Sequence, residues 1–250
     1  MDSCFRRNDE VVCGRATARR RPCDNAAASC SAIQVAAAGF VADHSGMTKV
    51  VPFKARGVRV LLRESLESRQ PLRFQRDGMQ PGMIHGFVVG MSPEFCLIAE
   101  IGDSLRLDGY LAVAIVDLTL VEVDPAADFV LKALALRGEV VSVPTDFKLD
   151  DWPSIAASAT VQAALISVNM VEDEEGEVSY VGQLAGVESD ALIMREVDPN
   201  AEWYPDTGAY EFELIGSIGF GTGYLDALWQ VAGNPADPLK PRAPVSDRLH

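Results

Sequence analysis

The sequence contains little of the chemistry that most enzymes use. Only three histidines occur among its 250 residues, at His44, His85 and His250. It has no Gly-x-Ser-x-Gly nucleophile motif, no His-Glu-x-x-His zinc motif and no Gly-x4-Gly-Lys phosphate loop. We therefore expect no catalytic residues, no cofactor and no enzyme activity.

Long apolar runs and runs of basic residues are also missing. No stretch of about 18 apolar residues occurs, so we expect no membrane-spanning helix and a cytoplasmic protein. The net charge is −14, and residues 1–46 carry +1, which leaves −15 for residues 47–250. So acidic a surface repels nucleic-acid phosphates and anionic lipid, which argues against both as partners.

Cysteine is scarce after the first 30 residues. Cys4, Cys13, Cys23 and Cys30 precede that point, and only Cys96 follows it. The spacings contain no Cys-x2-Cys pair of the kind that zinc sites use, so we expect no metal site. Cys96 lies in an apolar run and is expected to be a small buried side chain.

Both ends of the chain have the composition of unfolded segments. We expect residues 1–46 to be a disordered tail, and two origins stay open: translation of sequence upstream of a true start at Met47, or a targeting peptide with Arg19–Arg21 as its basic region. Residues 234–250 contain four prolines and few groups to bury, so we expect a second disordered tail.

The strongest signal is an internal repeat. Gly86–Ile101 aligns without gaps to Gly182–Val197 at an offset of 96 residues, and Phe129–Gly138 aligns to Tyr224–Gly233 at an offset of 95. The repeat predicts a first unit at 47–138, a linker at 139–150 and a second unit at 151–233. We expect the two units to pack as a pseudo-symmetric pair through their apolar C-terminal helices.

Each unit is predicted to be mainly β, within the α+β class. We expect an N-terminal helix, four strands and a short C-terminal helix, with mid-strand glycines marking bends or bulges. In copy one these are Val58–Ser68, Leu72–Arg76, Met83–Met91, Glu94–Ile101, Tyr110–Val123 and a helix ending at Gly138. In copy two they are Ile155–Ala164, with Asp151 and Pro153 at its start, then Leu165–Val171, Val178–Val187, Ala191–Val197, Tyr210–Phe220 and a helix ending at Gly233.

A short helix followed by bent strands, with Gly86 or Gly182 early in the second strand, resembles the Sm-like small β-barrel. The resemblance implies two tandem barrels. In RNA-binding members an Asp six residues after this Gly and an Asn ten residues after it form a nucleotide pocket. Here Ser92 and Glu188 stand at the first position, and Cys96 and Leu192 stand at the second. None of the four keeps the family pattern, so the RNA pocket is not expected.

Two further patterns have simpler interpretations. Gly216–Gly223 precedes a helix like a phosphate loop, but it has no lysine and is predicted to be a glycine-rich strand. Trp203 and Tyr204 are predicted to lie on a hairpin present only in copy two, where they form a contact surface rather than a ligand site.

These observations favour a non-enzymatic binding or assembly module. We expect its partner to be a further copy of itself, joined through edge strands, or another protein. Two alternatives stay open. One is an Sm-like RNA binder that uses a different surface, and the other is a hydrolytic enzyme whose paired carboxylates are Glu100 and Glu196.

Overall fold

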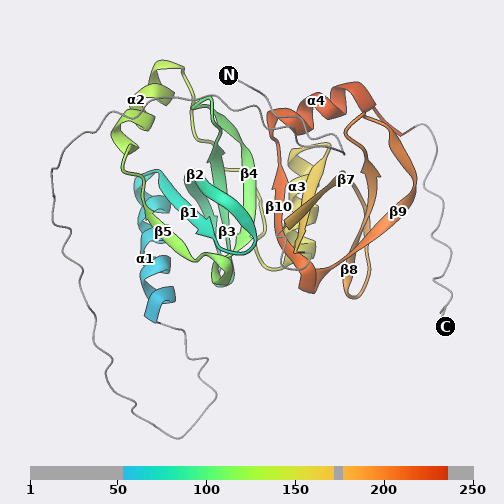
Figure 1. Ribbon diagram of the computed structural model, residues 1–250, viewed down its shortest axis with the longest axis horizontal. Helices are drawn as coiled ribbons and strands as arrows, with labels where there is room; N and C mark the ends of the chain where they lie inside the picture. The colour runs from blue at the N-terminus through green and yellow to red at the C-terminus, as the bar shows by residue number, and fades with distance from the viewer. Residues whose placement is uncertain (1–52, 172–176, 236–250) are drawn as a thin grey trace, which may run out of the picture. The chain divides into compact units, whose positions relative to one another are not determined.

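The computed structural model describes residues 53–171 and 177–235 (Figure 1). The two expected tails, apart from Asn234 and Pro235, and the acidic turn at 172–176 lie outside the described residues. In chain order the elements are α1 (Phe53–Ser68), β1 (Leu72–Arg76), β2 (Gln80–Met91), β3 (Phe95–Ile101), β4 (Leu107–Ala114), the 3-10 turn η1 (Ile115–Asp117), β5 (Leu120–Val123), α2 (Ala127–Leu136), α3 (Trp152–Gln162), β6 (Ile166–Val171), β7 (Glu177–Val187), β8 (Ala191–Val197), β9 (Trp203–Glu211), the 3-10 turn η3 (Phe212–Leu214), β10 (Ile215–Phe220) and α4 (Gly223–Ala232).

The same order of elements occurs twice. The strands of copy one pair in the order β5-β1-β2-β3-β4, and those of copy two pair in the order β10-β6-β7-β8-β9. The register repeats as well, because Gly86 lies opposite Glu100 and Gly182 lies opposite Glu196. The internal repeat of the sequence is therefore a repeat of structure, while the exact boundaries of the two units stay predictions.

Each copy contains five strands, so the prediction of four was wrong. The segments expected as one long strand, Tyr110–Val123 and Tyr210–Phe220, are each interrupted by a 3-10 turn. In copy one the turn connects β4, which pairs with β3, to β5, which pairs with β1. In copy two it connects β9, which pairs with β8, to β10, which pairs with β6. Apolar residues continue through each turn, so the sequence pattern does not distinguish the turn from a strand.

Glycines produce the bends expected in the second strand of each copy. A Cβ atom on Gly86 would lie 2.4 Å from the carbonyl oxygen of Ala99, and one on Gly182 would lie 2.1 Å from that of Arg195. The register then shifts before Gly90 and before Gly186. Only glycine permits the close backbone approach, and the bulge that follows bends the strand.

Three of the helix ends follow the expected signals, at Asp151, Gly138 and Gly233, and the cap at Thr222 was not predicted. Asp151 caps α3, because its carboxylate accepts a hydrogen bond of 2.8 Å from the Ser154 amide. Thr222 caps α4 by accepting from the Leu225 amide at 3.2 Å. Gly138 and Gly233 follow α2 and α4 with positive φ angles of 68° and 59°, as glycines after a helix commonly do.

The two copies are joined into one antiparallel sheet of ten strands. Its order is β5-β1-β2-β3-β4-β10-β6-β7-β8-β9, so β4 of copy one pairs directly with β10 of copy two. The paired positions run from Ser217 opposite Val113 to Phe220 opposite Tyr110. The mainly β fold class is confirmed. The sheet is open, so separate closed barrels of the Sm-like type are not what the strand pairing shows.

The buried side chains form three clusters. The largest combines residues of both copies, including Phe87 and Leu97 with Ile166 and Leu192, so the copies share a core. A second cluster lies within copy one beneath α1, and a third lies in copy two around Leu225 of α4. A shared core means that the two copies stabilise one another rather than fold as independent units.

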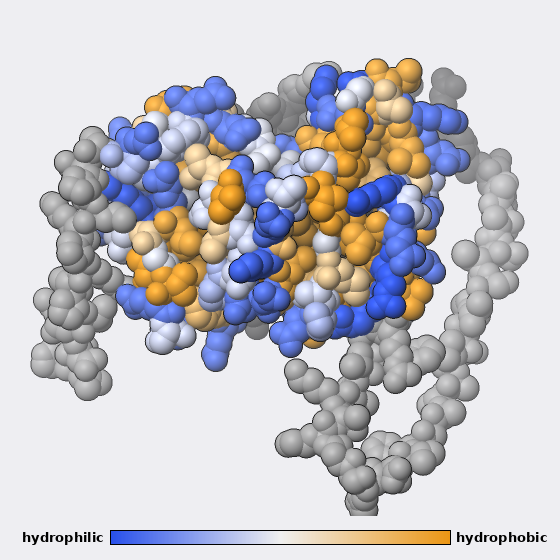
Figure 2. All heavy atoms as spheres, turned by 180° about the vertical axis from the view of Figure 1, so that it is seen from behind, coloured by the Kyte–Doolittle hydropathy of each residue, from blue (hydrophilic) through white to orange (hydrophobic). Residues whose placement is uncertain are grey.

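The buried side chains of the two C-terminal helices do not pack together, as the sequence suggested they would. The inward side chains of α2 and α4 belong to different clusters. Phe129 and Leu136 of α2 are 61% and 89% exposed, and Tyr224 and Val231 of α4 are also exposed. Figure 2 shows hydrophobic side chains gathered at its upper right, in the region of α2. The copies meet through the sheet, α3 and the inward face of α2, whose Val130 and Leu134 belong to the shared core.

Candidate functional site

A buried ion pair connects the two copies at the sheet junction. Arg76, at the end of β1, is fully buried, and its Nη2 lies 2.7 Å from Oε1 of Glu177 on β7. Its Nη1 donates to the other carboxylate oxygen at 3.0 Å. The pair is therefore bidentate, the geometry in which a guanidinium holds a carboxylate best.

The same guanidinium also holds β10. Arg76 donates to the carbonyl oxygen of Gly216 at 2.7 Å and to the hydroxyl of Ser217 at 3.2 Å. A Cβ on Gly216 would lie 2.0 Å from Glu177, so glycine is needed for the carboxylate to fit there. The glycine-rich segment after η3 is thus a strand shaped by the junction, as predicted, and not a phosphate loop.

A cavity of about 260 Å³, with both polar and apolar side chains in its wall, lies at the junction. Its wall combines Glu100 and Leu111 of copy one with Ser167, Asn169 and Gly219 of copy two, among other residues. Burial, with a smaller contribution from Asp108, raises the pKa of Glu100 to about 7. This cavity, which we name the inner cavity, therefore contains a carboxyl group that changes its charge near neutral pH.

A second cavity of about 320 Å³ lies beside β9 and contains Glu196, the counterpart of Glu100. We name it the outer cavity. Oε1 of Glu196 would lie 2.6 Å from a Cβ on Gly208, so the carboxylate occupies the space above this glycine. The pKa of Tyr210 is raised by burial and by the hydrogen bond that the Tyr210 hydroxyl donates to Glu196. The two glutamates named in the enzyme hypothesis line different cavities and do not form a pair.

The two edges of the sheet are β5 and β9, and β5 exposes side chains at positions that are buried in its counterpart β10. β5 has the place in copy one that β10 has in copy two, and β9 has the place of β4. Leu120 and Val123 of β5 are 37% and 40% exposed, whereas their counterparts Ser217 and Phe220 are fully buried. Within the described residues, neither edge has a further strand beside it.

The four positions of the family's RNA pocket lie in different surroundings. Cys96 and Leu192 are fully buried, and burial raises the pKa of Cys96 to about 12. Ser92 lies in the turn before β3, where its hydroxyl accepts from the amide of Phe95 at 3.0 Å. Glu188 lies in the corresponding exposed turn of copy two. The side chains of Cys96, Leu192 and Ser92 are therefore not free to read a base edge, whereas Glu188 is exposed.

Trp203 and Tyr204 lie at the start of β9, which has an equivalent in β4. The prediction of a hairpin unique to copy two was therefore wrong, since Val197 faces Trp203 as Ile101 faces Leu107. The Trp203 indole donates to the carbonyl of Gly233 at 3.1 Å and packs against Trp229. Tyr204 is half exposed. Of the two predicted contact residues, Tyr204 is thus the more exposed and Trp203 is packed against the end of α4.

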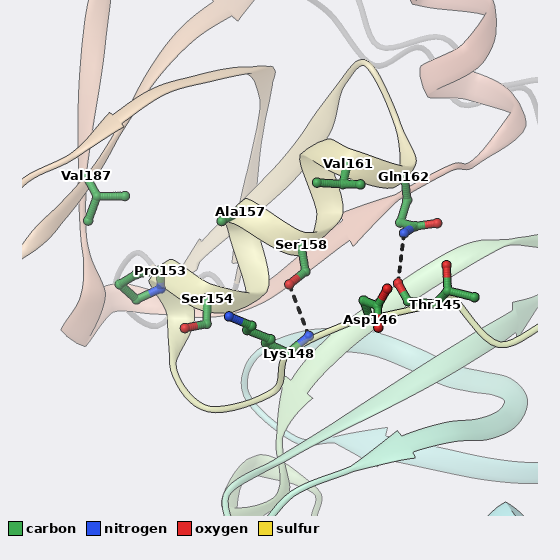
Figure 3. Close-up of a pocket in the computed structure, with 10 residues that line it drawn as sticks. All are labelled: Thr145, Asp146, Lys148, Pro153, Ser154, Ala157, Ser158, Val161, Gln162 and Val187. Atoms are coloured by element: carbon green, nitrogen blue, oxygen red, sulfur yellow. Dashed lines mark hydrogen bonds between the residues drawn. The ribbon is translucent and has the colours of Figure 1, made fainter.

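A groove of about 570 Å³ lies between α3 and the preceding linker (Figure 3). Its side chains are mostly small, apolar or hydroxyl-bearing, and hydrogen bonds from the Lys148 amide to Ser158 and from Gln162 to the Thr145 carbonyl tie the linker to the helix. None of the ten residues drawn is a histidine or cysteine. The groove shows no arrangement of nucleophile and base.

The remaining candidate groups have structural partners. Nδ1 of His85 lies 2.8 Å from the carboxylate of Asp124, which also accepts from the Ala126 amide at the start of α2.

No group of three metal-binding side chains occurs in residues 53–171 and 177–235. Across the same ranges, no helix combines the length and the apolar character needed to cross a lipid bilayer.

Sequence reasoning missed the Arg76–Glu177 pair. One signal was present, because Leu72, Phe74 and Arg76 alternate on one face of β1 and share its buried side. A charged residue at a core position of a strand implies a buried partner. The partner, Glu177, lies in the other copy, so the sequence pattern around Arg76 could not identify it.

Comparisons with protein-family models, with curated protein sequences and with solved structures returned no significant match.

Proposed function

We propose that the chain is a non-enzymatic assembly module that binds further copies of itself through the two edges of its sheet. Strand β9 of one copy pairs antiparallel with β5 of the next, as β4 pairs with β10 within the chain. The observation that supports this is the internal junction itself. The chain already uses this edge-to-edge pairing once, and it repeats the same two edges at its ends.

The internal register predicts the register between copies. Ser217 and Phe220 correspond to Leu120 and Val123, because they hold the same places opposite β6 and β1. In the same way Val113 and Tyr110, opposite β3, correspond to Tyr210 and Thr207, opposite β8. The four internal pairs therefore translate into Tyr210 with Leu120, Ala209 with Val121, Gly208 with Glu122, and Thr207 with Val123 of the next copy.

The two binding edges differ from each other, so assembly is head to tail. Such heterologous contacts form a closed ring when the rotation between copies closes, and a filament when it does not. Pro205 lies on β9, but outside the four paired positions, so the missing amide does not interrupt the proposed ladder. The Sm-like interpretation fits here, with each repeat acting as one small, bent-strand unit of the assembly.

The RNA and enzyme alternatives have less support. The charge of −15 for residues 47–250 opposes phosphate binding, and two of the four family positions, Cys96 and Leu192, are buried. Glu100 and Glu196 line separate cavities, which removes the geometric basis of a paired-carboxylate mechanism. A partner of another kind that adds a strand to β5 or β9 remains compatible with the same edges.

The mass of the full chain in solution tests the proposal. We expect analytical ultracentrifugation over a concentration series to show species larger than the monomer. Val123→Asp should weaken this assembly, because Val123 is placed like Phe220, which stacks on Tyr110 at 5.0 Å. A carboxylate at this position would be desolvated without a partner.

Val187→Asp is the matched control. Val187 is a strand valine of comparable exposure, 48% against 40% for Val123, but it lies on β7 in the interior of the sheet order. This variant should assemble like the unmodified chain. A chain that is monomeric at every concentration, or equal effects of both substitutions, would contradict the proposal.

A further inference from the structure

The outer cavity has only part of the wall that closes the inner one. The inner cavity is lined from copy one by Glu100 and Leu111, and from copy two by Ser167 and Gly219 across the junction. The outer cavity has the counterparts Glu196 and Gly208, but its residues all belong to copy two. The part of the wall that Ser167 and Gly219 form in the inner cavity has no equivalent in the outer cavity.

The register identifies the residues that a second copy would bring. Gly219 pairs with Ser167 between β10 and β6, and the corresponding pair between β5 and β1 is Glu122 with Arg73. These two side chains form an ion pair within their own copy. Where the inner cavity has a glycine and a serine, the outer one would therefore receive a glutamate and an arginine.

We propose that Arg73 and Glu122 of a second copy close the outer cavity, with the Arg73 guanidinium contacting the carboxylate of Glu196. The contact rests on the proposed assembly and specifies its chemistry. It makes Glu196 the acidic partner on the β9 edge and Arg73 the basic partner on the β5 edge. The pairing also sets the polarity of assembly, since each edge carries one of the two groups.

The space for the contact exists on both sides. Gly208 has no side chain, and the Glu196 carboxylate extends over it toward the edge. On the other edge, the Arg73 side chain is 29% exposed and its Nε is buried with no hydrogen-bond partner among the described residues. An arginine held between two carboxylates satisfies more of its five donors than one paired with Glu122 alone.

The outer contact differs in kind from the inner Arg76–Glu177 pair. Met170 occupies in copy two the place that Arg76 has in copy one, so the buried pair cannot recur between copies. Arg73 and Glu122 keep partial exposure, 29% and 41%, and salt screens such charges far more than buried ones. Assembly should therefore weaken as ionic strength rises, while the junction inside the chain persists.

Charge reversal in the full chain tests the contact. Glu196→Arg and Arg73→Glu should each raise the dissociation constant of assembly by about tenfold, measured by analytical ultracentrifugation, which corresponds to the loss of one favourable charge contact. An equimolar mixture of the two variants should assemble again, because the reversed β9 edge of one variant then meets the reversed β5 edge of the other, and the remaining edges are unmodified. Glu188→Arg, a reversal in the exposed turn between β7 and β8 and outside the outer cavity, should change nothing.

A second set of variants covers the case in which Arg73→Glu unfolds through repulsion from Glu122. Arg73→Gln and Glu196→Gln should each weaken assembly, and the double variant should be no weaker than either one. The inference is overturned if the unmodified chain assembles but the single variants assemble equally well, or if the losses add. A chain that stays monomeric without any substitution overturns the assembly proposal together with this contact.

Discussion

Nη2 of Arg76 lies 2.7 Å from Oε1 of Glu177, and this contact joins residues that are 101 positions apart in the sequence. Arg76 is fully buried, and Glu177 is nearly so. Because the pair spans β1 of copy one and β7 of copy two, it specifies which copies meet and in which register.

Removing one partner of this pair should be costly. Arg76→Met leaves the Glu177 carboxylate buried without its counter-charge, and we expect the free energy of unfolding to fall by about 3 to 5 kcal/mol. Urea denaturation monitored by circular dichroism measures it. The double variant Arg76→Met with Glu177→Gln should recover much of the loss. A loss below about 1 kcal/mol for the single variant would mean that the carboxylate is not desolvated.

Glu100 predicts a pH dependence of stability. Its pKa is raised from 4.5 to about 7 by burial, so the folded chain holds this proton more tightly than the unfolded chain does. Stability from this group is present below pH 4.5 and decreases as the pH rises toward 7. Glu100→Gln, which resembles the protonated form, should therefore stabilise the chain at pH 8 by about 1 to 3 kcal/mol.

The same substitution should have little effect at pH 4, and thermal melts at both values provide the measurement. Glu94→Gln, in the exposed turn before β3, is the control and should be neutral at both. Equal melting temperatures for Glu100→Gln and the unmodified chain at pH 8 would contradict a desolvated Glu100.

The close backbone approach at Gly182 predicts a strong response to a methyl group. Gly182→Ala places a Cβ 2.1 Å from the Arg195 carbonyl oxygen, and we expect a loss of about 3 kcal/mol, at the upper end of the range for overpacking. Gly186→Ala, four residues along the same strand, meets nothing within 4 Å and should cost under about 1 kcal/mol. Similar denaturation midpoints for both variants would argue against the bend at Gly182.

Much of the local structure was readable from the sequence. The repeat, the caps at Asp151 and Gly233, and the bends at Gly86 and Gly182 each depend on residues close together in the chain. Local signals suffice where the physical cause is local, as it is for a cap or a glycine bulge.

The junction between the copies could not be predicted in the same way. The pairing of β4 with β10 brings together Val113 and Ser217, and no pattern within either strand specifies the other. The 3-10 turns were missed because apolar residues such as Ile115 and Phe212 continue the strand pattern through them. Strand partners are selected by shape and by buried contacts across the sheet, which a single sequence does not display.

Nucleic acid should bind the chain only weakly. We expect filter binding of single-stranded RNA to the full chain to show no saturation below micromolar concentrations at physiological salt, because residues 47–250 carry a charge of −15. Saturable binding in that range, decreasing steeply with salt, would instead support the RNA alternative and place its site outside the four family positions.

The most direct test of edge-to-edge assembly is amide hydrogen exchange as a function of protein concentration. If β9 pairs with β5 of another copy, peptides containing Thr207–Tyr210 and Leu120–Val123 should become protected as the concentration rises. Peptides from β7, which is already paired on both sides, should not change. Protection that rises together in both edges, and in no other strand, is the predicted result. Edge amides whose exchange is the same at all concentrations, in a sample that contains larger species, would contradict the account.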